Sequence, residues 1–152
     1  MKEAKSMNAQ RKQERGFSLI ELLIVVVVIG IIAAIAIPYF ERARQPANAA
    51  SAIHSLRMIH SGEVSYRTLY AKYADIPALA SAGYVDDGHL RLGQKSNYVF
   101  VVTVDADPAL NYDANATPLF DPTVSEHFFI NATGVIHKET GASASATSAP
   151  LN

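Results

Sequence analysis

An apolar run near the N-terminus constrains this chain more than any other feature. From Leu22 to Phe40 the sequence has 19 residues without a charged side chain. As an α-helix rising about 1.5 Å per residue, this run is roughly 28 Å long, which matches the ~30 Å hydrocarbon core of a bilayer. Beyond Phe40, polar residues alternate with short apolar runs, as in an ordinary globular domain. The sequence therefore predicts a membrane segment followed by one small globular domain.

Positive charge is concentrated before the apolar run. Residues 1–16 carry five basic and two acidic side chains, whereas the rest of the chain carries eight basic and 12 acidic ones. A basic flank stays on the cytoplasmic side of a membrane, so the globule is expected on the opposite side. The globule is mildly acidic and has no basic patch interleaved with aromatic residues. Sequence-specific nucleic acid is therefore not an expected partner.

The chain contains no cysteine. Thiol chemistry, disulfides and cysteine metal sites are therefore excluded, and the globule must be held by its own core and by its neighbours. The sequence also has no Ser/His/Asp set, no Gly-rich phosphate loop and no carboxylate pair in a convincing context. We accordingly expect neither an enzyme nor a cofactor.

One carboxylate, Glu21, lies at the start of the apolar run. An unpaired carboxylate inside a membrane costs on the order of 2.5 to 3.5 kcal/mol and is by default a functional candidate with a partner to be found. The sequence offers no Lys, Arg or His between Ser18 and Tyr39 to act as that partner.

Three interpretations of Glu21 remain open on the residues alone. In the first, the run is a signal anchor and the carboxylate lies at the membrane interface, where its cost is small. In the second, it is a secretory signal peptide cut at the small residues 34–36, although the carboxylate and Pro38 argue against this. In the third, cleavage between Gly16 and Phe17 creates an α-amino group four residues before Glu21. An amine of the same chain or of an adjacent subunit would then pair with the carboxylate and lower its burial cost.

The start of the run resembles the prepilin signature of type IV pilins and pseudopilins. That signature has a short basic leader, a Gly before the cut, an aromatic first mature residue and a Glu as the fifth, and residues 15–23 read RGFSLIELL. The resemblance covers residues 11 to about 40 closely. It includes Gly30 and Pro38, which fall where many pilins have a helix-loosening Gly and Pro. Beyond residue 40 it is a likeness of organisation only.

The resemblance implies a particular fate for the chain. A prepilin peptidase and N-methyltransferase would cut after Gly16 and methylate Phe17, and Glu21 would be the charge partner during assembly. An inner-membrane platform protein and an assembly ATPase would then draw subunits from the lipid into a helical filament, as a homo-oligomer or a co-polymer with other pilins. Before assembly the chain would be a single-pass inner-membrane protein with a periplasmic globule, and afterwards part of a pilus at the cell surface.

The implied function is that of a structural subunit, a major or minor pilin of a bacterial type IV pilus. Two alternatives remain: a pseudopilin of type II secretion, and a membrane-anchored binding module that never polymerises. The N-terminal residue after export distinguishes the anchored binding module from the pilin and the pseudopilin, because only a processed subunit begins at Phe17.

Gly30 and Pro38 also have a purely structural interpretation. Gly in a helix costs up to about 1 kcal/mol relative to Ala, and Pro removes the hydrogen bond to the carbonyl of Ala34. Both residues are more frequent in membrane helices than in soluble ones, so either can be a tolerated irregularity. Under the pilin interpretation they soften the helix and let it unwind in a filament.

The predicted organisation has four parts: a basic leader (1–16), a transmembrane or filament-core helix (17–40), a globular domain (41–140) and a disordered Ala/Ser tail (141–152). Serines and threonines in the tail are candidate glycan acceptors, although an undecorated end is favoured. The helix is expected to continue to about residue 73, because apolar residues recur near helical spacing. These residues are Ala49, Ile53, Leu56, Ile59, Val64, Tyr66, Tyr70 and Tyr73.

Three later segments have β-strand patterns, namely 97–105 (NYVFVVTVD), 126–131 (EHFFIN) and 134–138 (GVIHK). The stretch 107–122 is predicted to be mostly loop, with a short extended piece near 111–115. Residues 131–134 (NATG) predict a hairpin turn in which Gly134 accepts a positive φ. We therefore expect an α+β, pilin-like fold: one long N-terminal helix packed by an antiparallel sheet of three to four strands.

No metal site is expected. The five histidines are scattered, and His60 with Glu63 is predicted to be a pair on the helix surface. The loop 105–115 is rich in oxygen ligands, and pseudopilins of type II secretion use calcium, so calcium is an alternative there. The loop nonetheless fails the EF-hand pattern, because Ala109 and Leu110 occupy positions that need a ligand and a glycine.

Overall fold

The computed structural model describes residues 17–151, which fall into two compact units. The first unit ends at Tyr39 and the second begins at Phe40. The helix α1 (Leu19–Tyr70) runs through both. The expected leader, including Gly16, lies outside the described residues.

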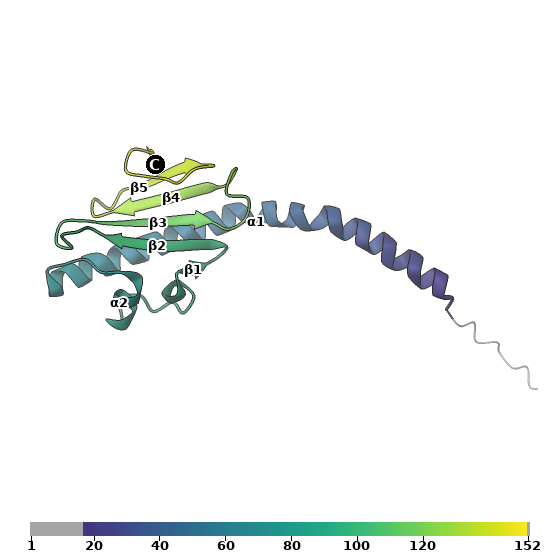
Figure 1. The fold of residues 1–152 in the computed structure, drawn as a ribbon, viewed down its shortest axis with the longest axis horizontal. Helices are drawn as coiled ribbons and strands as arrows, with labels where there is room; N and C mark the ends of the chain where they lie inside the picture. The colour runs from purple at the N-terminus through teal and green to yellow at the C-terminus, as the bar shows by residue number, and fades with distance from the viewer. Residues whose placement is uncertain (1–16, 152) are drawn as a thin grey trace, which may run out of the picture. The chain divides into compact units, whose positions relative to one another are not determined.

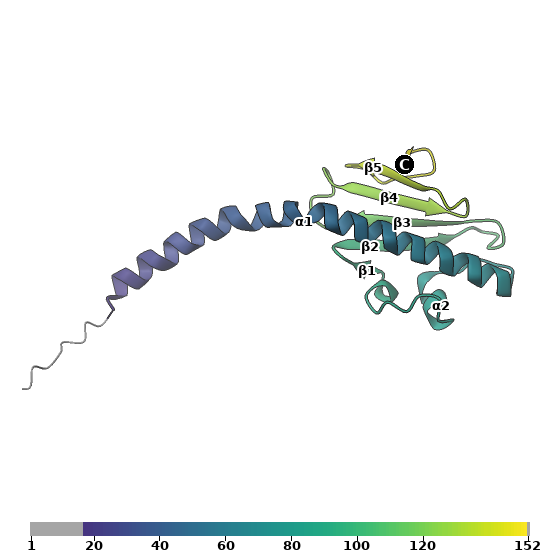
Figure 2. The ribbon, with the colours of Figure 1, turned by 180° about the vertical axis from the view of Figure 1, so that it is seen from behind.

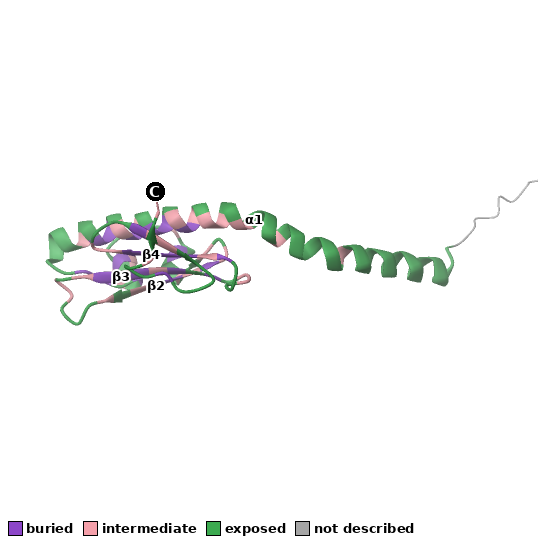
Figure 3. Ribbon diagram, turned by 90° about the horizontal axis from the view of Figure 1, so that it is seen from above, coloured by how far each residue is buried: buried purple, intermediate pink, exposed green. Residues whose placement is uncertain are grey.

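The described part of the first unit, residues 17–39, is helical from Leu19 onward and apolar on every side. Its large side chains are exposed, from 46% for Val25 to 88% for Leu19, and Figure 3 shows this part of α1 almost entirely in the colour of exposed residues. Within the described part of the chain, α1 is the one helix long and apolar enough to cross a membrane. Exposed apolar surface on this scale is unfavourable in water, so the unit needs lipid or other helices around it.

The second unit combines the rest of α1 with a sheet. The described residues form α2 (Ile76–Ser81), the short helix η1 (Leu90–Leu92) and six strands: β1 (Gln94–Lys95), β2 (Tyr98–Val104), β3 (Tyr112–Pro118), β4 (Glu126–Asn131), β5 (Ile136–Thr140) and β6 (Ala149–Pro150). The strands pair in sequence order, each antiparallel to the next (Figure 1). The part of α1 after Phe40 runs across one face of this sheet (Figure 2).

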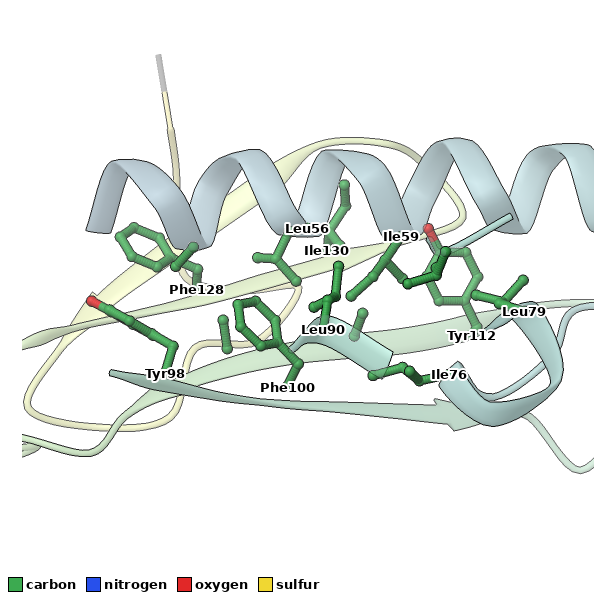
Figure 4. Close-up of a cluster of buried hydrophobic side chains, with 14 of the residues drawn as sticks. Leu56, Ile59, Ile76, Leu79, Leu90, Tyr98, Phe100, Tyr112, Phe128 and Ile130 are labelled. Atoms are coloured by element: carbon green, nitrogen blue, oxygen red, sulfur yellow. The ribbon is translucent and has the colours of Figure 1, made fainter. Parts of the chain in front are cut away.

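The core lies between that face of the sheet and α1. Leu56 and Ile59 of α1 are fully buried, and so are Ala114 and Ala116 of β3. Figure 4 shows Leu56 and Ile59 packing against side chains of the strands. The small alanines of β3 leave room for the helix side chains, and burying each large apolar side chain contributes roughly 1.5 to 3 kcal/mol. The α+β, pilin-like fold class is therefore confirmed.

The number of strands is larger than predicted. The sheet within the described residues has six strands rather than three to four. Strands β1 and β6 have two residues each, which is too short for a sequence pattern. The third missed feature is the length of β3 inside the predicted loop 107–122. Its sequence, YDANATP, is poor in strand-forming residues, yet it pairs on both sides and buries alternate positions.

Two predicted ends also differ in detail. Helix α1 ends at Tyr70 rather than near residue 73, because Ala71 adopts a left-handed φ of 56° and the chain reverses there. The hairpin turn after β4 has the predicted geometry. Gly134 has a φ of 76°, and its N–H donates to the carbonyl of Asn131 at 3.0 Å.

The C-terminal segment differs from the expected disordered tail. Strand β6 pairs with β5, and the N–H of Leu151 donates to the carbonyl of Ile136 at 2.8 Å. Ala144 is only 5% exposed. The segment is held mainly by backbone hydrogen bonds and small side chains, which require no apolar pattern in the sequence.

Candidate functional site

The residues of the predicted processing site lie at the beginning of α1. Phe17 precedes the helix and is 79% exposed. Glu21 is the acidic residue of the first helical turn, where a negative charge is favoured by the helix dipole. Ser18 occupies the position just before the helix, and its carbonyl accepts the N–H of Leu22 at 3.2 Å. Phe17 and Glu21 are thus about one turn apart at the start of the apolar surface.

Ser18 and Glu21 have a sequence spacing that the sequence analysis did not use. Ser at the N-cap with Glu three residues later is the spacing of a capping box, in which the two side chains satisfy free N–H groups of the first turn. Glu21 therefore has a structural role available besides a charge-pairing role. The pattern S-x-x-E before an apolar run is the sequence signal for it.

Among residues 17–151, Glu21 is in no ion pair. The ion pairs among residues 17–151 are Lys95 with Asp87 and Lys138 with Glu126, both at 2.8 Å and both in the second unit. The side chain of Glu21 is exposed. A terminal amine created by cleavage, or a group of another chain, remains the predicted partner of this carboxylate.

Gly30 and Pro38 lie within the unbroken helical span of α1. A Cβ built on Gly30 would meet no atom within 4 Å. Contacts within the chain therefore do not explain the missing side chain. Small residues on a membrane helix allow close approach of a neighbouring helix, and Ala33, Ala34 and Ala36 extend this small-residue region.

The second unit begins with an aromatic and cationic turn. The guanidinium of Arg44 lies 4.6 Å from the ring centroid of Phe40, and Arg42 is also exposed. Aromatic and basic residues directly after an apolar span are typical of a membrane interface.

The second unit has a cavity in which Gln45, Ser125 and Glu126 are paired with other groups of the chain. One cavity of about 250 Å³ is lined by Gln45, Ser125 and Glu126, among others. Gln45 donates to Ser125 at 3.0 Å, and Glu126 is paired with Lys138. Because these polar groups already have partners within the chain, the cavity gives no support to an enzyme.

The histidines that make hydrogen bonds have partners that fit structural roles. His127 donates through Nε2 to the carbonyl of Pro122 at 2.9 Å, and His137 donates through Nδ1 to that of Ser148 at 2.7 Å. His60 lies 2.6 Å from the hydroxyl of Tyr112. Glu63, predicted to pair with it on the helix surface, is instead fully buried. The signal for this was its position four residues after Ile59, on the apolar face of the helix.

The proposed calcium loop is divided between a turn and a strand. Asp105 and Asp107 accept N–H groups of the following turn, at 3.3 and 3.0 Å, whereas Asp113 and Asn115 belong to β3. Across the described residues, no group of three or more His, Cys, Asp or Glu side chains is arranged to hold a metal ion.

Comparison with known proteins bears on the N-terminal segment. The family model of the prokaryotic N-terminal methylation motif matches residues 11–37. The N-terminal segment is therefore similar to the N-terminal methylation motifs of prokaryotic proteins. A relative, the type IV major pilin protein PilA of Myxococcus xanthus (strain DK1622), is 40% identical over 63 residues, which are 41% of this chain and 29% of that relative. The resemblance to type IV pilins is therefore confirmed, and the shared region spans less than a third of the relative's length.

The motif and the apolar part of α1 together suit a membrane-anchored pilin. They point to a structural protein rather than to an enzyme. The motif includes Gly16, Phe17 and Glu21, whose individual roles remain predictions.

Proposed function

We propose that this protein is a structural subunit, a major or minor pilin, of a bacterial type IV pilus. The observation that carries the proposal is the prepilin-type motif at residues 11–37 joined to a helix that is apolar on every side. A helix with no buried apolar stripe of its own is suited first to lipid and then to a bundle of like helices. The subunit would stay single-pass in the inner membrane, with its globule in the periplasm, until it enters a filament.

Processing would supply the missing partner of Glu21. Hydrolysis of the peptide bond between Gly16 and Phe17 by a prepilin peptidase leaves a free α-amino group on Phe17, and methylation of this amine keeps it basic. An unpaired charge in a dry environment costs on the order of 2.5 to 3.5 kcal/mol. In a helix bundle, an amine beside the carboxylate removes most of this cost. If the amine belongs to the neighbouring subunit, the pair also sets the register between the two helices.

The alternatives differ in what happens after export. A type II secretion pseudopilin would be cut and methylated in the same way but retained in the periplasm. A membrane-anchored binding module would keep its leader and stay in the membrane. Assembly into either filament would require the platform protein and the ATPase, with the chain as a homo-oligomer or a co-polymer.

The test is the intact mass and N-terminal sequence of the protein from membranes and from sheared surface material. We expect a chain that begins at methylated Phe17 and is present in the sheared fraction. The processed chain in membranes alone would favour the pseudopilin. A chain beginning at Met1 would overturn the processing proposal, and one beginning at Ile37 would mean a secretory signal.

Substitution of Gly16 gives a matched pair of variants for the same test. Gly16→Leu places a bulky side chain before the bond to be cut and should leave uncut protein in the membrane, whereas Gly16→Ala should slow cleavage less. Equal cleavage of both variants would contradict the need for a small residue at this position.

A further inference from the structure

A buried carboxylate lies at the C-terminal end of α1, outside the proposed processing site. The side chain of Glu63 is fully buried. Its Oε2 accepts the N–H of Ala74 at 3.0 Å, and its Oε1 has no hydrogen-bond partner among the described residues. An ionised carboxylate with one donor and no cation in a dry environment is unfavourable, so this position selects the neutral acid.

The groups around Glu63 on its own helix do not neutralise a negative charge. Arg67, one turn later, donates to the hydroxyl of Tyr73 at 3.2 Å, and its guanidinium lies 5.0 Å from the centroid of that ring. Neither ion pair within residues 17–151 includes Glu63. His60, one turn earlier, is directed to Tyr112, and burial lowers its pKa, which keeps the imidazole neutral near pH 7.

The elements packed against α1 here place no cation in an ion pair with Glu63, because Lys72, the basic residue of the reversal 71–75, is exposed and is in neither ion pair of residues 17–151. Strand β3 contributes Tyr112, which is 1% exposed and whose hydroxyl is directed toward α1 in Figure 4. Its ring packs against Tyr73, in the chain reversal 71–75, with a centroid distance of 4.9 Å and an angle of 55° between the ring planes. The same reversal brings Asp75, a like charge, near Glu63. From the β4–β5 hairpin, Gly134 contacts His60, because a Cβ there would lie 2.9 Å from Nε2.

Both environment and charge act on the titration of Glu63. Burial raises its pKa to about 7, the hydrogen bond from Ala74 opposes the shift, and the charge of Asp75 adds to it. Burial also raises the pKa of Tyr112, as does the charge of Glu63.

Glu63 connects α1 to the chain reversal that follows it. The reversal begins at Ala71, whose φ is 56°. Its backbone is held at two points: the N–H of Tyr73 donates to the carbonyl of Pro108 at 2.7 Å, and the N–H of Ala74 donates to Glu63. One of these two attachments therefore depends on the state of a single buried carboxyl group.

We propose that Glu63 is a proton-controlled latch that holds the reversal 71–75 against α1 when it is protonated and loosens it when it ionises. The proposal concerns the globule alone and does not depend on the proposed pilin function. Because the folded state keeps the proton to higher pH than the unfolded state, the latch stabilises fully below the ordinary pKa of 4.5 and is lost as the pH rises through about 7.

The test uses the full chain in detergent micelles and follows the exchange of the Ala74 amide, corrected for its intrinsic pH dependence. Between about pH 5 and 8 we expect the protection of this amide to fall by about tenfold or more. Glu63→Gln keeps the shape of the side chain but cannot ionise, so it should remove this dependence. Glu139→Gln, at an exposed position, should retain it.

Either of two results would overturn the latch. One is a protection of Ala74 that does not change with pH in the wild-type chain, and the other is an unchanged dependence in Glu63→Gln. Should that variant fail to fold, the carboxyl carbon of Glu63 in the wild-type chain decides by NMR. An inflection near pH 7 supports the latch, and one near pH 4.5 contradicts it.

Discussion

The two parts of α1 have similar apolar residues but use them in different ways. Before residue 40, side chains such as Leu19 and Val26 are 88% and 60% exposed, whereas Leu56 and Ile59 in the second unit are fully buried. A helix with one apolar face can be covered by its own sheet, but a helix apolar all round needs a partner outside the chain. The apolar side chains of the first part can therefore be covered only by association with lipid or other helices, whereas those of the second part are covered when the globule folds.

Their carboxylates show the same difference. Glu21 is exposed in the first turn of α1, and the described ion pairs do not include it. Glu63 is buried, and its hydrogen bond is to the same chain, at Ala74. Burial of Glu21 in a dry environment would therefore require a cationic partner from outside its own helix, whereas the ionisation of Glu63 is controlled by pH within the globule.

The largest expected difference comes from truncating apolar side chains in the two parts. Leu56→Ala leaves a cavity in the core and should lower the free energy of unfolding of the globule by about 2 to 5 kcal/mol. Val26→Ala, at an exposed position, should change it by less than about 0.5 kcal/mol. Urea unfolding of the full chain in micelles measures both. Equal losses would contradict the division of the helix into an associating and a folding part.

The next effect concerns Glu21. Glu21→Ala should leave cleavage intact while strongly reducing assembly or N-methylation, because the carboxylate that pairs with the amine is lost. The amine would then be unpaired in a dry environment, which costs on the order of 2.5 to 3.5 kcal/mol. The measurement compares the N-terminal mass with the yield of sheared filaments. Glu139→Ala removes an exposed carboxylate of the globule and serves as the control. Normal filaments from Glu21→Ala would disprove the charge pairing.

The sequence predicted the elements whose patterns are strong. The apolar run and the helical spacing after it predicted α1, and the β-branched and aromatic residues of β2 predicted that strand to within a residue or two. Strand β3 was predicted only as a short extended piece near 111–115, because Asp, Asn and Ala seldom form strands. It is held by neighbouring strands on both sides and by α1 above Ala114 and Ala116.

The rest of the fold depends on contacts that no local pattern records. Strand β6 rests on backbone hydrogen bonds to β5, and Glu63 is buried because its side of the helix faces the core. At the candidate site, the motif predicted Gly16, Phe17 and Glu21 by residue type. The partner of Glu21 would be made by cleavage, so it is absent from the sequence as written.

A smaller effect, at Gly30, tests whether the first part of α1 contacts a neighbouring helix. Gly30→Ala should stabilise the helix by up to about 1 kcal/mol and leave the globule unchanged, because no atom lies within 4 Å of the added methyl group. Gly30→Leu should reduce filament yield if a neighbouring helix approaches here. Yields of sheared filaments from both variants provide the measurement. Equal assembly of the Leu and Ala variants would remove Gly30 from the helix contact.

The smallest effect separates two carboxylates of the globule by the direction of their pH dependence. The hydrogen bond from Lys95 lowers the pKa of Asp87 to about 2 from 3.8, so its contribution is present above pH 3.8 and is lost as the pH falls through about 2. Glu63 acts in the opposite direction, between pH 4.5 and about 7. Lys95→Ala should therefore cost less than about 1 kcal/mol at neutral pH, and this cost should become smaller near pH 2, where about half of Asp87 is protonated.

Urea unfolding of Lys95→Ala at the two pH values checks this prediction, with Arg57→Ala as the control, because Arg57 is exposed and is in neither ion pair of residues 17–151. A cost for Lys95→Ala that persists near pH 2 would mean that the lysine acts through packing rather than through the charge of Asp87. A cost for Lys95→Ala that falls at low pH would mean that the contribution of Asp87 is lost toward acid. The contribution of Glu63 is lost toward high pH, so the two carboxylates act in separate pH ranges.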